Sequence, residues 1–411
     1  MTDIHKLLSK MTLEEKIGQL VQLGTNVFLE SQDQITGPLY KLGLTQDDLN
    51  RTGNVIGCWK MLEIQKKHLE NDPNKIPLLF MLDVVHGFRT VYPIPLALGC
   101  SFNSELVADC SRMAAKEAAS AGVHVTFAPM VDYVRDSRWG RVLETFGEDA
   151  LMNSLLGAVQ VKAFQGDDLS DSDNIAVCVK HFAAYGGAEA GRDYNSVDLS
   201  EHALREYYLP AYKACIDAGA SMVMPAFNTL NGVPCTANPW LMKKILRDEW
   251  NFDGVVISDY GAIGELVKHG VAKDKKAAAK LAIDNGCDID MCSGSCVHHL
   301  KELVEDGSVS EEQIDKAVLR VLKLKEKLGL FKDPYRGVYE SKESETILAP
   351  ESYATARKAA EESAVLLKNN GVLPLSDTVK KVAVIGPFAD SKGLLGAWSG
   401  VGRIEETTSI A

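Results

Sequence analysis

The sequence contains no long run of hydrophobic residues. Its 411 residues include no stretch of roughly 18 consecutive apolar residues, the length that a membrane-spanning helix needs. The first twenty residues, MTDIHKLLSKMTLEEKIGQL, carry charges throughout and have no apolar centre of signal-peptide length. These absences predict a soluble protein that does not bind membranes, and the lack of a visible signal peptide predicts a cytoplasmic location.

Basic residues are fewer than acidic residues. The chain has 44 lysines and arginines against 56 aspartates and glutamates, so its formal net charge is -12. An acidic surface repels phosphate backbones, which makes nucleic acid an unfavourable partner. A GxGxxG motif is missing after the first predicted strand, which weakens the alternative of a dinucleotide-binding fold.

The nine cysteines are odd in number and scattered along the chain. This pattern is typical of free thiols in a reducing compartment. Only Cys292 and Cys296, beside His298 and His299, resemble a metal site. Their spacing matches no familiar zinc pattern, which favours an ordinary loop and helix start. We therefore expect no metal at this segment.

Short apolar segments alternate with longer helical patterns along most of the chain. Eight segments are apolar nearly throughout, as expected of parallel strands buried on both faces. Alternating β and α units of this number favour a (β/α)8 TIM-type barrel over a doubly wound sheet. The predicted strands cover residues 18–24, 54–59, 78–84, 124–129, 176–182, 221–227, 254–260 and 288–293.

The pattern changes after an amphipathic helix predicted within residues 304–329, with Ser310 as its N-cap. We assign residues 1–330 to the barrel and the polar, proline-bounded residues 331–350 to a linker. Residues 351–411 are expected to begin a second α/β domain, with a helix at 351–363, then AVLLKNN (364–370), and a strand in KKVAVIG. This part is too short to close a core of its own, so we expect it to be incomplete.

Polar residues follow several predicted strands at their carboxyl ends, where a parallel barrel gathers its catalytic groups. Asp259 ends the run GVVIS, where an unpaired charge would be costly. Its carboxylate can attack an anomeric carbon, or it can cap the following helix; the pattern favours neither. Lys180 and His181 can donate hydrogen bonds to a ligand. Alternatively, Lys180 can pair with a barrel carboxylate and His181 can be a buried core histidine.

Two loops add further candidates. The arginines of RDSRWGR (135–141) can hold hydroxyls or a carboxylate. They can equally form salt bridges with the nearby acidic residues Asp132, Asp136, Glu144 and Glu148. Arg192 lies in a glycine-rich loop after 176–182 that can form a pocket wall.

Taken together, these motifs resemble glycoside hydrolase family 3, and most nearly its bacterial β-glucosidases. The resemblance covers nearly the whole chain in the family's order, and the joint match is far more specific than any single motif. It implies an exo-acting, retaining hydrolase that releases terminal non-reducing β-D-glucose from β-glucosides and short β-gluco-oligosaccharides through a covalent intermediate. The motifs are MTLEEKIGQL, LDVVHG (82–87), RDSRWGRVLETFGED (135–149), KHFAAYGG (180–187), VMPAFNTLNGVP (223–234), NFDGVVISDY (251–260) and AVLLKNNGVLPL (364–375).

The resemblance also implies roles for single residues. Asp259 matches the nucleophile, and Tyr260 matches an aromatic residue that stacks on sugar. Met224 and Phe227 match pocket-lining positions, and the family often has Tyr where Phe227 stands. No metal or organic cofactor is implied. The positions that match hydrogen-bonding partners of the terminal sugar are Asp83, Arg141, Lys180, His181 and Arg192.

A retaining mechanism needs a second carboxyl group roughly 5–5.5 Å from the nucleophile, to protonate the leaving oxygen. In two-domain members of the family this acid/base Glu comes from the second domain, and the resemblance implies that the chain ends before it. The N-acetylglucosaminidase branch instead has a His–Asp pair after KHF, but AAYGGAEAGRD contains no histidine. The chain is therefore expected to be C-terminally truncated. A β-xylosidase-type member and a non-catalytic carbohydrate-binding fragment are the alternatives.

Overall fold

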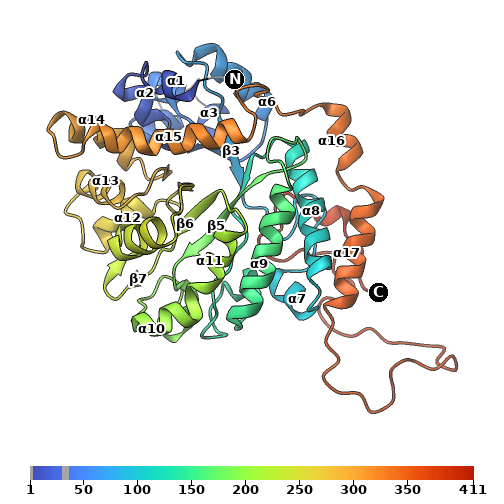
Figure 1. The fold of residues 1–411 in the computed structure, drawn as a ribbon. Coiled ribbons are helices and arrows are strands. Elements are labelled where there is room, and N and C mark those ends of the chain that lie inside the picture. The colour runs from blue at the N-terminus through green and yellow to red at the C-terminus, as the bar shows by residue number, and fades with distance from the viewer. Residues whose placement is uncertain (1–2, 30–36) are drawn as a thin grey trace.

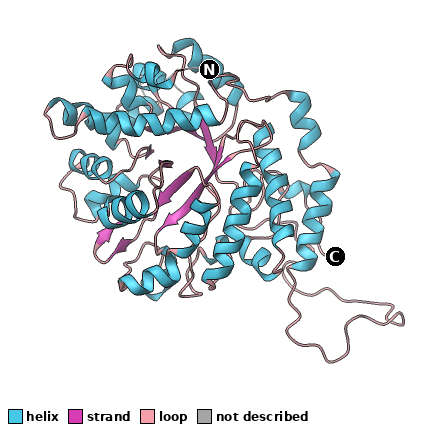
Figure 2. Cartoon of the chain, viewed as in Figure 1, coloured by secondary structure: helices cyan, strands magenta, loops and turns pink. Residues whose placement is uncertain are grey.

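The computed structural model describes residues 3–29 and 37–411. Eight parallel strands form one sheet in the order β10-β1-β2-β3-β4-β5-β6-β9. A further parallel bridge between Ile257 and Ile289 joins the two outer strands, so the sheet closes into a barrel (Figure 2). The strands are β1 Val21–Gly24, β2 Asn54–Ile56, β3 Leu79–Leu82, β4 Val125–Thr126, β5 Ala176–Phe182, β6 Met222–Pro225, β9 Val255–Val256 and β10 Asp290–Met291.

Each strand lies within its predicted segment, and the TIM-type barrel is confirmed. The apolar composition explains the arrangement, because the strands have the barrel interior on one face and helices on the other. All seven residues of β5 are buried. A separate antiparallel hairpin of β7 (Thr229–Leu230) and β8 (Val233–Pro234) lies outside this sheet.

Helices surround the barrel (Figure 1). Those that precede residue 101 are α1 Ile4–Leu8, α2 Leu13–Gly18, α3 Thr25–Leu29, α4 Pro38–Leu42, α5 Gln46–Arg51, α6 Met61–Asn71 and α7 Pro95–Cys100. The next are α8 Ser104–Ser120, α9 Ala150–Gln165, α10 Glu201–Ala203, α11 Pro210–Asp217, α12 Ala262–Lys268, α13 Lys275–Asp284, α14 Ser295–Glu305 and α15 Glu311–Lys327. A π-helix covers Trp240–Glu249 between β8 and β9.

Two local predictions about these helices are confirmed. The Ser310 hydroxyl accepts a hydrogen bond from Gln313 N and caps α15, as predicted. Cys292 lies in the loop before α14, which begins at Ser295, so this segment is the expected loop and helix start.

The region after the barrel differs from the prediction. The predicted linker contains a helix, α16 (Glu340–Thr346), and α17 (Pro350–Glu362) follows it; both pack along α8 (Figure 1). Residues 364–411 are all described and contain no strand, so the prediction of a strand in KKVAVIG is wrong. A strand needs a neighbour for its backbone hydrogen bonds. No described segment pairs with these residues, and most of their large apolar side chains are exposed.

Candidate active site

A cavity of about 1130 Å³, its open mouth included, lies at the carboxyl ends of the barrel strands. Eight of the nine predicted site residues line it. Arg192 is exposed and is not on the cavity wall, so its role in sugar binding stays a prediction. The eight residues are Asp83, Arg141, Lys180, His181, Met224, Phe227, Asp259 and Tyr260.

Asp259 follows β9 and is 8% exposed. Its Oδ1 accepts a hydrogen bond from Tyr260 N at 2.7 Å, whereas Oδ2 has no hydrogen-bond partner among the described residues. Burial raises the pKa of Asp259 to about 6, although Lys180 and Arg141 oppose this effect. Asp259 does not cap α12, because Gly261 is the N-cap and contributes no side-chain bond. The helix-cap alternative is therefore wrong. Asp259 lines the cavity, and its buried Oδ2 has no hydrogen-bond donor among the described residues.

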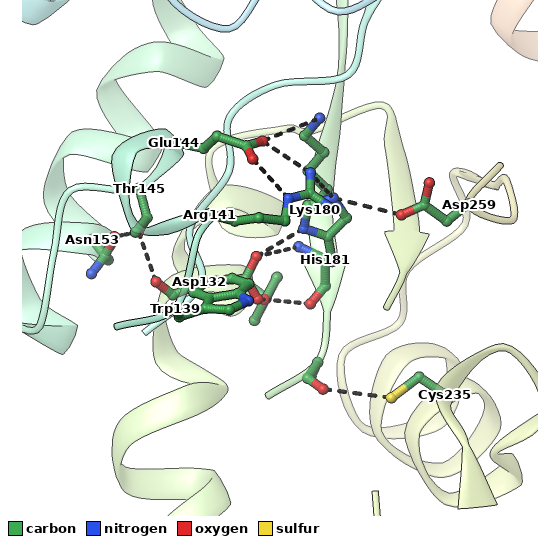
Figure 3. A network of polar contacts seen from close by, with 12 residues as sticks. Asp132, Trp139, Arg141, Glu144, Thr145, Asn153, Lys180, His181, Cys235 and Asp259 are labelled. Atoms are coloured by element: carbon green, nitrogen blue, oxygen red, sulfur yellow. Dashed lines mark hydrogen bonds and ion pairs between the residues drawn. The ribbon is translucent and has the colours of Figure 1, made fainter. Parts of the chain in front are cut away.

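A buried hydrogen-bond network holds His181 beside Asp259 (Figure 3). Asp132 Oδ2 accepts hydrogen bonds from His181 N at 3.0 Å and from Nδ1 at 2.9 Å. Asp132 Oδ1 accepts one from the Tyr212 hydroxyl at 2.7 Å. Arg141 Nη2 lies 3.2 Å from His181 Nε2. Because a guanidinium only donates, Nε2 must accept, and the imidazole proton lies on Nδ1.

This tautomer explains the free oxygen of Asp259. Burial, together with the charges of Arg141 and Lys180, lowers the pKa of His181 well below its ordinary range, so the ring is neutral. His181 Nε2 lies 3.6 Å from Asp259 Oδ2 and presents only a lone pair to it. The histidine therefore leaves the carboxylate available to another group.

Lys180 and Arg141 each form the ion pair considered for them, and their role in binding a ligand stays a prediction. Lys180 Nζ donates to Asp83 Oδ1 at 2.7 Å, and Arg141 forms a two-point hydrogen bond to Glu144 at 2.7 and 3.0 Å. Both cations also line the cavity. Burial lowers the pKa of Arg141, but the hydrogen bond and charge of Glu144 outweigh it and raise the pKa overall.

A register shift explains how Lys180 and His181 both reach the cavity. Neighbours on a regular strand point to opposite faces. The pairing of β5 with β6 shifts between Lys180 and Phe182, at the end of the strand. This irregularity explains how two consecutive side chains can face the same cavity.

Sequence reasoning missed Trp398, which lies on the cavity wall. Its ring lies 5.2 Å from Lys180 Nζ and 5.7 Å from Arg141 Cζ, within the range of cation–π contacts. Trp398 belongs to the segment after α17 that returns to the barrel. Its motif, GAWSG, contains no signal of a barrel contact.

Three contacts hold this returning segment on the loop after β3. His86 Nε2 lies 2.7 Å from Ala397 O, and Val401 N donates to Phe88 O at 3.1 Å. Arg89 Nε donates to Glu406 Oε2 at 2.8 Å. Within residues 3–29 and 37–411, no three His, Cys, Asp or Glu side chains gather in a way that could hold a metal ion.

The chain matches two family models and several known proteins. Residues 12–324 match the glycosyl hydrolase family 3 N-terminal domain, and residues 364–411 match the C-terminal domain. A periplasmic β-glucosidase of Salmonella typhimurium is 42% identical over 99% of this chain and 53% of its own length. A β-xylosidase of Formosa agariphila is 34% identical over 97% of this chain and 53% of its own.

A solved structure is similar in both sequence and shape. It is an aspartate-to-alanine mutant of the β-glucosidase from Listeria innocua in complex with laminaribiose. The TM-score is 0.95 at 46% identity, over 98% of this chain and 57% of that chain.

These comparisons bear on location, length and family. The described part of the chain has no helix long and apolar enough to cross a membrane, and a cytoplasmic location stays a prediction because the Salmonella relative is periplasmic. The chain spans about half the length of the curated relatives it matches. It belongs to glycosyl hydrolase family 3.

Proposed function

We propose that this chain carries the nucleophile of an exo-acting, retaining β-glucosidase. Its substrates are β-glucosides and short β-gluco-oligosaccharides, from which it releases terminal non-reducing β-D-glucose. The single observation that carries the proposal is Asp259, a buried carboxylate that lines a cavity with Lys180 and Arg141 and whose Oδ2 has no hydrogen-bond donor among the described residues. The complexes of the Listeria β-glucosidase with laminaribiose and with glucose support this substrate class.

In the proposed first step, Asp259 Oδ2 bonds to the anomeric carbon while the bond to the leaving oxygen breaks. The electron pair of that bond stays on the leaving oxygen, which takes a proton from the acid. Water then displaces the carboxylate and restores the original configuration. With its pKa at about 6, Asp259 is largely ionised at neutral pH, as a nucleophile must be.

The Asp83–Lys180 ion pair is proposed to bind one end of the sugar ring. The Asp83 carboxylate accepts hydrogen bonds from sugar hydroxyls, and the Lys180 ammonium group donates hydrogen bonds to them. Met224 and Phe227 give the cavity an apolar wall against which the ring carbons can pack. Trp398 closes another side.

The acid/base group is proposed to come from outside the described residues. Three further carboxylates line the described cavity, and each already accepts a hydrogen bond. Asp83 accepts from Lys180, Glu144 from Arg141, and Asp193 from Trp139 Nε1 at 2.9 Å. The side chains of Lys180, Arg141 and Trp139 thus already engage these three carboxylates. A Glu of the family's C-terminal domain, beyond residues 364–411, is therefore the expected acid.

Turnover of dinitrophenyl β-glucoside, followed by NMR of the released sugar, tests this function. Its leaving group needs little help from an acid, so the chain is expected to release dinitrophenol in a burst. The sugar, freed slowly because the attacking water lacks its base, is expected as β-glucose before α-glucose. A first product with the α configuration would contradict retention. The Formosa relative favours β-xylosidase activity as the second candidate. Faster release of dinitrophenol from dinitrophenyl β-xyloside than from dinitrophenyl β-glucoside would favour this second function over the first. Sugar binding without any release, unchanged in Asp259→Asn, would indicate a non-catalytic carbohydrate-binding fragment.

A further inference from the structure

His86 joins two segments that are far apart in sequence. It lies in the loop after β3, it is 4% exposed, and both nitrogens of its ring lie close to backbone carbonyl oxygens. Nδ1 lies 2.8 Å from Tyr92 O of the same loop, and Nε2 lies 2.7 Å from Ala397 O of the segment that returns to the barrel. The next residue of that segment, Trp398, lines the cavity together with Asp259. His86 therefore acts on the peptide that carries one wall of the candidate site.

The two carbonyl oxygens bear on the protonation state of this ring. A carbonyl oxygen only accepts hydrogen bonds, so both ring nitrogens must donate. A neutral imidazole has a single N–H, and its other nitrogen would present a lone pair to a carbonyl oxygen at 2.7 or 2.8 Å. Both contacts are hydrogen bonds only when the ring carries two protons and a positive charge. The geometry of His86 therefore fits an imidazolium.

Glu117 of α8 supplies a negative charge beside the same loop. It is 1% exposed, and its carboxylate accepts four hydrogen bonds from uncharged donors, namely Arg89 N, Thr90 N, the Thr90 hydroxyl and Leu348 N. A buried cation is costly unless an opposite charge offsets it, so this carboxylate favours the imidazolium. Arg403 and Glu405 of the returning segment are exposed. The remaining charged side chains named on these elements form the ion pairs Arg89–Glu406 and Asp83–Lys180.

Trp398 depends on its neighbours for its position. Its φ angle is 58°, a left-handed conformation that residues other than glycine rarely adopt. Such a conformation persists only where the surrounding contacts hold it. Ala397 O belongs to the peptide bond that precedes Trp398, so the hydrogen bond from His86 holds the backbone directly at this residue. Loss of that bond would let the indole ring move from the cavity wall.

We propose that protonated His86 is a positioning residue for the candidate site, because its Nε2–H holds Trp398 on the cavity wall. The consequence for sugar binding rests on the proposed function. When the ring loses one proton, the remaining N–H stays on Tyr92 O, since the hydrogen bond from Tyr92 N to His86 O at 2.8 Å keeps the two residues together. The bond to Ala397 O is then lost. The wall at Trp398 loosens as the pH rises through the range in which histidine side chains change charge, about pH 5 to 8.

Fluorine NMR of the chain labelled with 5-fluorotryptophan follows the position of Trp398. The chain has five tryptophans, and Trp398→Phe identifies the signal of this one. We expect this signal to shift between about pH 5 and pH 8. In His86→Asn, whose short amide reaches Tyr92 O but not Ala397 O, the signal should stay at its high-pH position throughout. In His86→Gln, whose longer amide reaches Ala397 O and does not titrate, it should stay at its low-pH position.

His202→Asn is the matched control, because the side chain of His202 on α10 is 86% exposed. The Trp398 signal of this variant should shift with pH as it does in the unaltered chain. Asp259 lines the same cavity and has a pKa of about 6. A shift that persists in His86→Asn would therefore belong to another group such as Asp259, and it would overturn the inference. A Trp398 signal that does not shift in the unaltered chain would overturn it as well.

Glucose binding, measured by calorimetry, connects this position to the site. His86→Asn should weaken binding about fivefold at about pH 5 and hardly at all at about pH 8, because the unaltered chain loses the same hydrogen bond as the pH rises. An equal weakening at both pH values would mean that His86 acts only through packing, and it would overturn the inference. If the unaltered chain binds no glucose at either pH, the proposed function is wrong, while the fluorine titration still decides the role of His86.

Discussion

Asp259→Asn should stabilise the folded protein at neutral pH while removing the proposed nucleophile. Burial raises the pKa of Asp259 from an ordinary 3.8 to about 6, so the folded protein holds this proton more tightly than the unfolded chain. As pH rises through this window, the carboxyl ionises at a cost in the folded state, and the free energy of unfolding falls. A difference of about 2 pKa units corresponds to about 3 kcal/mol. Asparagine never ionises, so the variant avoids this loss.

Urea unfolding at a series of pH values measures the effect. The free energy of unfolding of Asp259→Asn, relative to the unaltered protein, should rise by about 3 kcal/mol between about pH 4 and pH 7 and then level off. Asp136→Asn is the control: the hydrogen bond from Arg138 lowers the pKa of the half-buried Asp136 to about 2, below this range. Its relative stability should stay constant above about pH 4. A constant difference for Asp259→Asn as well would refute the reasoning.

Two further substitutions probe the surroundings of the site. Asp132→Ala leaves His181 N, His181 Nδ1 and the Tyr212 hydroxyl without their carboxylate acceptor, and we expect the free energy of unfolding to fall by about 3 kcal/mol or more. Urea unfolding checks this, and a loss of unfolding free energy no larger than that caused by Asp136→Ala would contradict it. Arg89→Ala removes the ion pair with Glu406 that holds the segment carrying Trp398, and we expect glucose to compete about tenfold less well against labelling. An unchanged glucose affinity would mean that Trp398 does not help to hold the sugar.

The barrel could be predicted from sequence because its strands are apolar and short and recur between helices. The same reasoning failed after α17. AVLLKNN and KKVAVIG have the composition of strands, but a strand forms only when a neighbour supplies hydrogen bonds. Composition describes a segment and does not show whether its neighbour is present. The polar residues 331–350 were assigned to a linker from composition alone. Composition did not reveal that α16 forms there and packs on α8.

The site was predictable only in part. Strand ends and the family resemblance led to eight residues that line one cavity. The sequence indicated Asp132 as a possible salt-bridge partner of the arginines in 135–141. Only the folded chain shows that Asp132 fixes the tautomer of His181. Trp398 reaches the cavity through contacts between segments that are far apart in sequence, which no local pattern reveals. Exposed Arg192 matches the family motif, but matching a motif does not place a side chain on the cavity wall.

Covalent trapping tests the central claim, that Asp259 is the nucleophile. The chain is incubated with dinitrophenyl 2-deoxy-2-fluoro-β-glucoside and weighed intact by mass spectrometry, and a labelled peptide is then sequenced. We predict a mass gain of one fluoroglucosyl unit, located on Asp259 and absent from Asp259→Asn. A label on another residue, a label that persists in Asp259→Asn, or no label on the folded protein would contradict the account.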